Sequence, residues 1–304
     1  MNIKVIINSR TIRKRRRWIE SIISKKLNQH NIDIEQTRYP GHAIEISGAV
    51  RNKSFDAIVA VGGDGTINEV INGMNNSKIA LGIIPTGTAN DFATHLKIPK
   101  DTERACDLIN TGKRYRYDLI RVNGWNYITS GGIGLPCDVL RVIDKDRNRR
   151  RQYNPILAIL GSHLYSWALA RVLISGSHRA NRIRMEINGH RYDLIASTLI
   201  IGNQPCLGGH YQVLPNAANT DGFFDLCLIE YTGSLFCLVR TLLKVLKGKH
   251  SYRSDVKIFH AQNILIESSN PIDFYADGEI KLKDTNFNVQ IMPKAIQIIS
   301  PAGS

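Results

Sequence analysis

Three glycines and an aspartate stand together in the segment VGGDGTINE, which covers residues 61–69. Glycine lets the backbone turn tightly and approach a ligand closely. The segment joins an apolar strand pattern to a helical one, so we expect the amides of Thr66 to Asn68 to point at an anion from a helix N-terminus. A phosphate is the natural occupant, and the alternative is a turn that only caps the helix with Asp64 or Thr66.

A second loop of small residues, PTGTAND at 85–91, follows the next strand pattern. Two neighbouring strands that each end in such a loop can form a two-walled pocket at one edge of a sheet. The sequence contains neither GxxxxGK[ST] nor GxGxxG, and it lacks the signatures of protein kinases. A P-loop, a dinucleotide fingerprint and a protein kinase site are therefore excluded.

Acidic residues beside glycine recur in the second half of the chain, in DGFFD at 221–225 and in YADGE at 275–279. Taken one by one, such residues most often form turns. Together they supply what phosphoryl transfer requires. A carboxylate can orient a hydroxyl and accept its proton, and hard oxygen ligands can hold Mg²⁺.

The first 120 residues alternate β-branched apolar runs with helical patterns. We expect strands at 3–7, 32–37, 56–61 and 79–84, and helices around 18–27, 43–50 and 67–74. Strands separated by helices imply parallel pairing in a three-layer α/β domain. Ligands of such sheets bind beyond the carboxyl ends of the strands.

From about residue 115 the pattern changes to strands joined by turns, with Asn-Gly pairs at 123–124 and 188–189. This pattern predicts a β-sandwich that is interrupted by helices around 137–174 and 233–248. The pattern alone leaves open where the last strand, 295–299, belongs. The expected domains are an α/β domain at 1–120, with or without 290–304, and a β-rich domain at 121–289.

The formal net charge of +14 requires an anionic partner, such as nucleotide phosphates, nucleic acid or an acidic membrane surface. Arg10–Arg17 and Arg141–Arg151 concentrate this charge, and each is either a membrane-docking cluster or a solvated helix face. The apolar run 155–174 contains polar residues, so we expect a packed or interfacial helix there and no membrane span.

The N-terminus has apolar residues before basic ones, which reverses the order of a signal peptide. The five cysteines show neither CxxC nor a nearby histidine spacing, so they suggest no disulfide framework and no zinc site. We therefore expect a protein of the reducing cytosol.

In their order, these motifs resemble the catalytic domain shared by diacylglycerol kinases, ceramide kinases and sphingosine kinases, and especially the soluble bacterial lipid kinases. The resemblance spans nearly the whole chain. The matching segments are GGDGTINEV at 62–70, GIIPTGTANDFA at 82–93, GGIG at 131–134, LGGHYQVLPNAANTDGFFDL at 207–226 and DGE at 277–279.

The resemblance implies a lipid kinase that uses ATP and Mg²⁺. By the same resemblance, Glu279 or Asp277 beside it is the general base, and Asp64 acts through catalytic Mg²⁺ with water between. A structural Mg²⁺ site maps onto Asp221, with the backbone carbonyls of Ala218 and Phe223 as co-ligands. The residues expected at the nucleotide are Asn8, Thr37, Gly62, Gly63, Asp64, Gly65, Thr66, Ile67, Asn68 and Thr88.

The segment Asn8-Ser9-Arg10 departs from the family, because the usual asparagine-proline and serine-glycine are missing. Arg10 offers a guanidinium that can reach phosphate, and ATP remains the expected donor. The nearest alternative is NAD kinase, which shares GGDGT but not the second loop, PTGTANDFA. The more distant alternative is a non-catalytic basic module that binds membrane or nucleic acid.

The expected partner is a lipid presented at an anionic membrane surface, so the protein is expected to be cytoplasmic and peripheral at the inner membrane surface. No nucleic acid is expected. The sequence leaves open which lipid is the acceptor, and whether the chain forms a homodimer.

Overall fold

The computed structural model describes residues 1–9, 11, 13–51, 53–75, 77–87, 89–149, 164–207, 211–245, 247–249 and 253–301. The chain divides into two units. The first comprises Met1–Leu119 together with Met292–Ser304, and the second comprises Ile120–Ile291. The first unit is therefore discontinuous in sequence.

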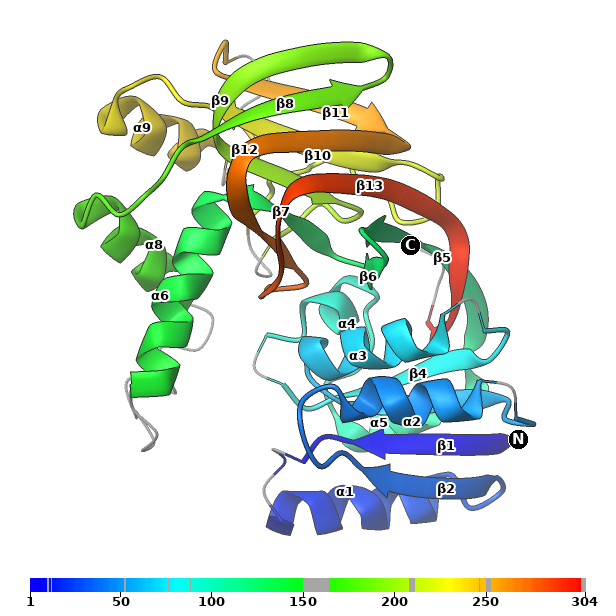
Figure 1. Ribbon diagram of the computed structural model, residues 1–304. Coiled ribbons are helices and arrows are strands. Elements are labelled where there is room, and N and C mark those ends of the chain that lie inside the picture. Colours follow the sequence, from blue (N-terminus) through cyan, green and yellow to red (C-terminus); the bar gives the residue numbers. More distant parts are fainter. Residues whose placement is uncertain are drawn as a thin grey trace. The chain divides into compact units, whose positions relative to one another are not determined.

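The first unit alternates strands and helices along the chain (Figure 1). Its elements are β1 (Asn2–Ile7), α1 (Arg13–Lys26), β2 (Asn31–Gln36), α2 (His42–Val50), β3 (Ala57–Gly62), α3 (Asp64–Met74), β4 (Ala80–Pro85), α4 (Asp91–His95), α5 (Thr102–Thr111) and most of β5 (Lys113–Val122).

Strands β2, β1, β3 and β4 lie side by side in this order, and all of them are parallel. Next to β4 lies the end of β13 (Glu279–Ser300), where Ile298 pairs in parallel with Leu81. Strands β3 and β4 are buried along their whole length, which explains their continuous apolar sequences. Because the strands point the same way, their carboxyl ends meet at one edge of the sheet.

Helices cover both faces of this parallel sheet. Helices α1 and α5 pack on one face, where Ile19, Ile23 and Ile109 join the odd-numbered residues of β1 and β3 in one apolar core. Helices α2 and α3 contact each other, and they contact β1 and β3 respectively. The predicted three-layer α/β domain is thus confirmed.

The second unit is rich in strands. Its elements are the end of β5, β6 (Trp125–Tyr127), β7 (Ser130–Gly134), α6 (Leu135–Arg149), α8 (Leu164–Ile174), β8 (Asn181–Ile187), β9 (His190–Gly202), β10 (Phe224–Glu230), α9 (Leu235–Val245), β11 (Val256–Ala261), β12 (Asn263–Ala276) and most of β13.

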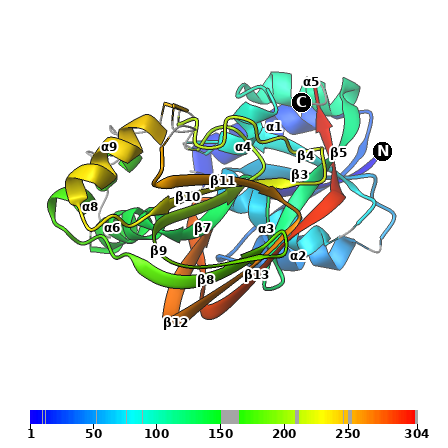
Figure 2. The ribbon, with the colours of Figure 1, turned by 90° about the horizontal axis from the view of Figure 1, so that it is seen from above.

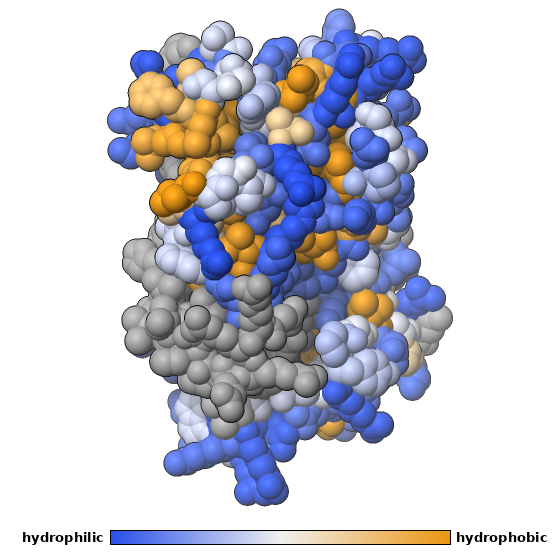
Figure 3. Space-filling model, turned by 60° about the vertical axis from the view of Figure 1, so that its left-hand side comes forward, coloured by the Kyte–Doolittle hydropathy of each residue, from blue (hydrophilic) through white to orange (hydrophobic). Residues whose placement is uncertain are grey.

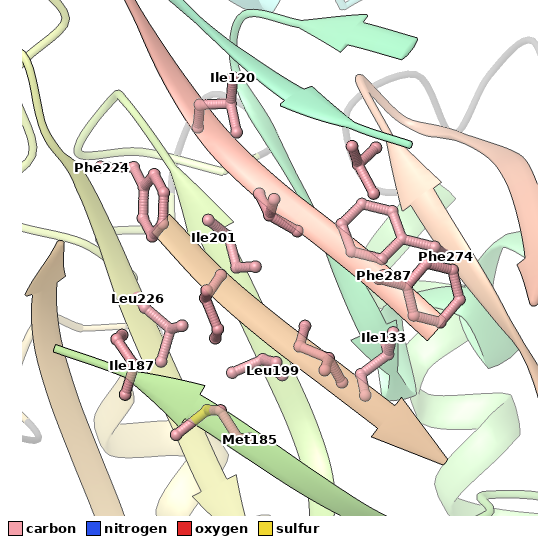
Figure 4. Close-up of a cluster of buried hydrophobic side chains, with 14 of the residues drawn as sticks. Ile120, Ile133, Met185, Ile187, Leu199, Ile201, Phe224, Leu226, Phe274 and Phe287 are labelled. Atoms are coloured by element: carbon pink, nitrogen blue, oxygen red, sulfur yellow. The ribbon is translucent and has the colours of Figure 1, made fainter. Parts of the chain in front are cut away.

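These strands pair antiparallel in the order β11-β10-β9-β7-β12-β13, and β8 pairs with both β9 and β12. Both Asn-Gly pairs form turns in which both residues have positive φ, at 123–124 and at 188–189. Alternate strand residues, such as Leu226, Phe274 and Phe287, fill a shared apolar core (Figure 4). The predicted β-rich unit is confirmed, and its arrangement fits a β-sandwich.

Helices α6, α8 and α9 pack against the opposite face of β9 and β10, and they lie on the same side of the unit in both ribbon views (Figures 1 and 2). Within the expected helix at 155–174, residues 155–163 lie outside the described residues. The described part, α8, buries Leu164, Ala168 and Val172 along one face, so it is a packed helix. None of the described helices combines the length and the apolar character that crossing a bilayer requires.

Candidate active site

The first glycine loop connects β3 to α3. The helix begins at Asp64, three residues earlier than expected. The amides of Thr66 and Ile67 both donate to the carbonyl of Gly63, at 3.0 and 3.1 Å, so the expectation that they face an anion is wrong. The first amides of an α-helix have no intrahelical acceptor, and in α3 these include the amides of Asp64 and Gly65. They are the donors suited to a phosphate.

The two small-residue loops pack against each other, backbone to backbone. The amide of Thr86 donates to the carbonyl of Gly62 at 2.8 Å. A Cβ atom added at Gly87 would lie 2.5 Å from the Cα of Gly63, and one added at Gly62 would lie 2.4 Å from Oγ1 of Thr66. The glycines are therefore required by the packing of the loops, independently of any ligand.

Asp64 joins the two loops through its side chain. Its Oδ1 accepts a hydrogen bond from the amide of Phe92, at 3.3 Å, at the start of α4. Burial raises the pKa of Asp64 above its ordinary value, although the nearby amides of Phe92, Asp91 and Asn90 oppose that shift. Burial disfavours the ionised form of this half-buried carboxylate, and a bound cation would offset that cost. Asp64 therefore fits a role at Mg²⁺.

Two neighbouring strand ends complete this edge of the sheet. Asn8 follows β1, and its Nδ2 donates to Oγ1 of Thr66 at 2.5 Å. Thr37 follows β2, and its buried Oγ1 accepts from the amide of Ser9 at 2.9 Å. Asn8, Thr37 and the glycine loop thus lie at one edge, as the sequence predicts for parallel strands. Thr88 lies outside the described residues.

In the second unit, Asp277 occupies the tight turn between β12 and β13, where its φ is +47°. Its buried carboxylate accepts hydrogen bonds from the amide of Ile128 at 3.2 Å, and from the amide and hydroxyl of Thr129 at 2.8 and 2.6 Å. These donors hold the loop before β7 against the turn. Asp277 therefore has a structural role, whatever its part in catalysis.

Glu279 lies two residues further along, at the start of β13, and its surroundings are different. Its side chain is 54% exposed, and its carboxylate pairs with Nζ of Lys281 at 2.6 Å. Lys281 in turn lies over the ring of Trp125, 4.9 Å from its centroid. Glu279 is thus an accessible carboxylate with its side chain oriented by a neighbour, which suits a group that must meet a substrate.

The expected metal ligands lie in the turn before β10. Oδ1 of Asp221 accepts the amide of Phe223 at 3.0 Å. The pKa of nearby Asp225 is raised, mainly by burial and further by the negative charge of Asp221, while His260 opposes the shift. The exposed carboxylate of Asp221 and the nearby carboxylate of Asp225 supply hard, anionic oxygen atoms of the kind that Mg²⁺ prefers. The carbonyls of Ala218 and Phe223 remain co-ligands that the resemblance implies.

No group of three or more His, Cys, Asp or Glu side chains in the described part of the chain is placed to hold a metal ion. A site at Asp221 would accordingly depend on carbonyl and water oxygens as well as its carboxylate. This is the donor set that the resemblance implies, and it differs from the histidine and cysteine clusters that bind zinc.

Thr129 and Asn203 were not expected from the sequence. Thr129 donates to Asp277, and its carbonyl accepts the amide of Asn203 at 3.1 Å. The side chain of Asn203 is fully buried, and neither of its polar atoms has a partner among the described residues. The available signal was the abrupt change from Ile200-Ile201-Gly202 to a polar residue at the end of a strand.

Models of two known protein families together match most of the chain. Residues 2–122 match the model of the diacylglycerol kinase catalytic domain, and residues 144–300 match that of the YegS C-terminal NAD kinase beta sandwich-like domain. The diacylglycerol kinase of Bacillus subtilis is 28% identical over 246 residues, covering 80% of this chain and 77% of that one. A Yersinia enterocolitica protein named "Probable lipid kinase YegS-like" is 30% identical over 260 residues, covering 82% and 80%.

Solved structures share the fold. The crystal structure of a diacylglycerol kinase from Bacillus anthracis superposes with a TM-score of 0.74 at 22% identity, covering 100% of this chain and 98% of that one. A second solved chain from the same organism gives a TM-score of 0.80 at 23% identity, covering 100% and 98%.

Proposed function

This chain belongs to the diacylglycerol kinase-like family of lipid kinases, which are phosphotransferases with an alcohol acceptor, and from this premise we propose that it transfers the γ-phosphoryl group of ATP to the hydroxyl of diacylglycerol or a related lipid. The observation that carries the proposal is the pair of interlocked loops at the carboxyl edge of the parallel sheet. There helix α3 begins at Asp64, whose carboxylate accepts the amide of Phe92 from the second loop.

The phosphate end of the nucleotide would lie at the first glycine loop. The amides of Asp64 and Gly65 are the donors for its oxygens, and Thr66, held by Asn8, supplies a hydroxyl at the same edge. Thr37 would contribute from the adjacent strand end. We assign these residues to binding and positioning, which provide most of the acceleration in phosphoryl transfer.

Glu279 is the better candidate for the proton acceptor. Asp277 already accepts the three donors of Ile128 and Thr129, so it serves as a positioning residue for the turn that carries Glu279. In the reaction, the acceptor oxygen forms a bond to the γ-phosphorus while the bond to the β–γ bridging oxygen breaks. ADP leaves, and the proton of the hydroxyl passes to the carboxylate of Glu279.

Mg²⁺, when bound, would neutralise charge on the phosphate oxygens and so favour the in-line displacement. Asp64 is the residue proposed to hold the catalytic ion, through water. Asp221, with the carbonyls of Ala218 and Phe223, is proposed to hold a structural ion in the second unit. The acceptor is a membrane lipid, so we propose that the protein acts as a peripheral protein at an anionic membrane surface.

The test is the transfer of labelled phosphate from ATP to a panel of diacylglycerol, monoacylglycerol, ceramide, sphingosine and NAD, each dispersed in detergent. Wild type should label a lipid, Asp64→Ala should not, and Glu279→Gln should label it at least about 100-fold more slowly. Labelling of NAD alone would establish the NAD kinase alternative. A protein that labels none of these acceptors would refute the proposal.

A further inference from the structure

Helix α9 exposes large apolar side chains to solvent. Phe236 is 76% exposed, Leu243 is 58% exposed and Leu235 is 48% exposed. Phe236 and Leu243 are seven residues apart, which is close to two helical turns, so they lie on the same face. A surface helix of a globular protein normally carries only polar residues on its outer face, whereas α9 exposes large apolar side chains there as well.

The inner face of α9 is fully used by the fold. Leu238, Leu242 and Val245 are buried in the apolar core that the helix shares with β10. Thr241 on the same face donates to Asp255, whose carboxylate also pairs with Arg253. The orientation of the helix is thus fixed from inside, so the outward residues are not needed to hold it in place.

The outer face of α9 is bordered by positive charge. Arg240 and Lys244 are exposed on the helix, and Lys247 and Lys249 are exposed just after it. The sequence from 231 to 254 contains no Asp or Glu. Figure 3, in which this side of the unit faces forward, shows apolar residues gathered beside strongly hydrophilic ones.

We propose that α9 is the element that docks the enzyme on an anionic phospholipid bilayer, with Phe236 and Leu243 inserted among the acyl chains and the neighbouring cations at the headgroups. This deepens the proposed function, on which it rests, because the acceptor lipid resides in such a bilayer. Apolar residues at the outermost helical position with flanking Lys and Arg are the pattern of an interfacial helix.

Charge complementarity selects the bilayer over a second copy of the chain. Two copies that met through α9 would bring two acid-free, basic segments together, and like charges oppose such contact. In the sequence cluster Arg141–Arg151, the described part begins with a cation that is already neutralised. Arg141 is already paired with Asp138 and Asp273, and the side chains from 147 onward in this cluster lie outside the described residues.

The test is binding of the full chain to phosphatidylglycerol vesicles by co-sedimentation, without nucleotide or acceptor lipid. The double variant Phe236→Ser/Leu243→Ser should bind at least about tenfold more weakly. Arg240→Gln/Lys244→Gln should lose about fivefold for each charge, and its binding should fall less steeply with rising salt than that of wild type. The matched control is Leu265→Ser, which removes a 47% exposed leucine from β12, and it should bind like wild type.

Thermal denaturation verifies that each variant is folded, which is expected because the substituted side chains are exposed. Equal vesicle binding by wild type and Phe236→Ser/Leu243→Ser would overturn the proposal, as would a wild type that ignores anionic vesicles. A wild-type dimer that the same double substitution converts to monomer, with vesicle binding unchanged, would assign the helix to a second copy. The detergent assay of lipid phosphorylation is separate, so failure of docking and failure of the kinase function are distinguishable.

Discussion

Asp277 and Glu279 are two residues apart, yet their substitutions should have opposite effects on stability and catalysis. Asp277→Ala removes the acceptor for the amides of Ile128 and Thr129 and for the hydroxyl of Thr129, all of which are buried. Each unsatisfied buried donor costs about 1–3 kcal/mol, so the total is about 3 kcal/mol at the lower bound. Alanine at a positive φ adds about 1 kcal/mol.

The expected result for Asp277→Ala is thus a loss of about 4 kcal/mol in the free energy of unfolding. Asp277→Asn keeps an oxygen acceptor and tolerates the left-handed conformation, so it should cost about 1 kcal/mol or less. Glu279→Gln changes an exposed group and should leave stability unchanged. It should lower kcat by about 100-fold or more while nucleotide affinity stays the same.

The measurements are urea unfolding followed by circular dichroism, nucleotide binding by calorimetry, and phosphate transfer to the best lipid acceptor. Unfolding of Asp277→Ala at the same urea concentration as wild type would show that the turn does not depend on these hydrogen bonds. The assignment of the proton acceptor fails if Glu279→Gln retains full kcat, or if Asp277→Asn, although stable, loses as much kcat as Glu279→Gln.

Three further substitutions probe the remaining parts of the site. Gly87→Ala should lower the thermal midpoint and weaken nucleotide binding, because its Cβ would lie 2.5 Å from the Cα of Gly63. Asp64→Asn should raise the thermal midpoint at pH 7. Burial raises the pKa of Asp64, so the ionised carboxylate destabilises the folded state above that pKa, and the gain should shrink as pH falls. Adding Mg²⁺ should raise the thermal midpoint of wild type, and Asp221→Asn should lose most of that rise.

Each of these three predictions would be contradicted by a definite result. An unchanged midpoint for Gly87→Ala would mean that the two loops can separate without cost. A lower midpoint for Asp64→Asn, or a difference that does not depend on pH, would show that the amides around Asp64 outweigh its burial. An equal response of wild type and Asp221→Asn to Mg²⁺ would place the stabilising ion elsewhere.

Much of the first unit could be predicted because its signals are local. The apolar strands β3 and β4 lie within a residue or so of their predicted positions, and so do the Asn-Gly turns of the second unit, since strand burial and positive φ depend on nearby sequence. The start of α3 was placed too late because the helix begins inside the glycine loop. Glycine is a poor helix former, and the packing of the loops overrides that preference.

Other features depend on distant partners and could not be predicted. Nothing in the sequence near Asp277 reveals that its carboxylate is held by residues 128 and 129, which are almost 150 positions away. The same holds for the buried amide of Asn203. The resemblance allows either Asp277 or Glu279 to be the general base. Only the contacts of the two carboxylates show that Asp277 is held in the turn and that Glu279 is accessible.

The first unit is completed by residues from the end of the chain, and this order affects how the unit folds during synthesis. The buried hydroxyl of Tyr117 bonds Ser300 at 2.9 Å, Asp118 accepts the amide of Lys294 at 2.6 Å, and β4 pairs with the end of β13. The α/β unit therefore cannot be completed while residues 292–300 are still inside the ribosome, although its first 119 residues emerge early. Until then, one edge of its sheet stays open, which is the stage at which a nascent chain depends most on chaperones.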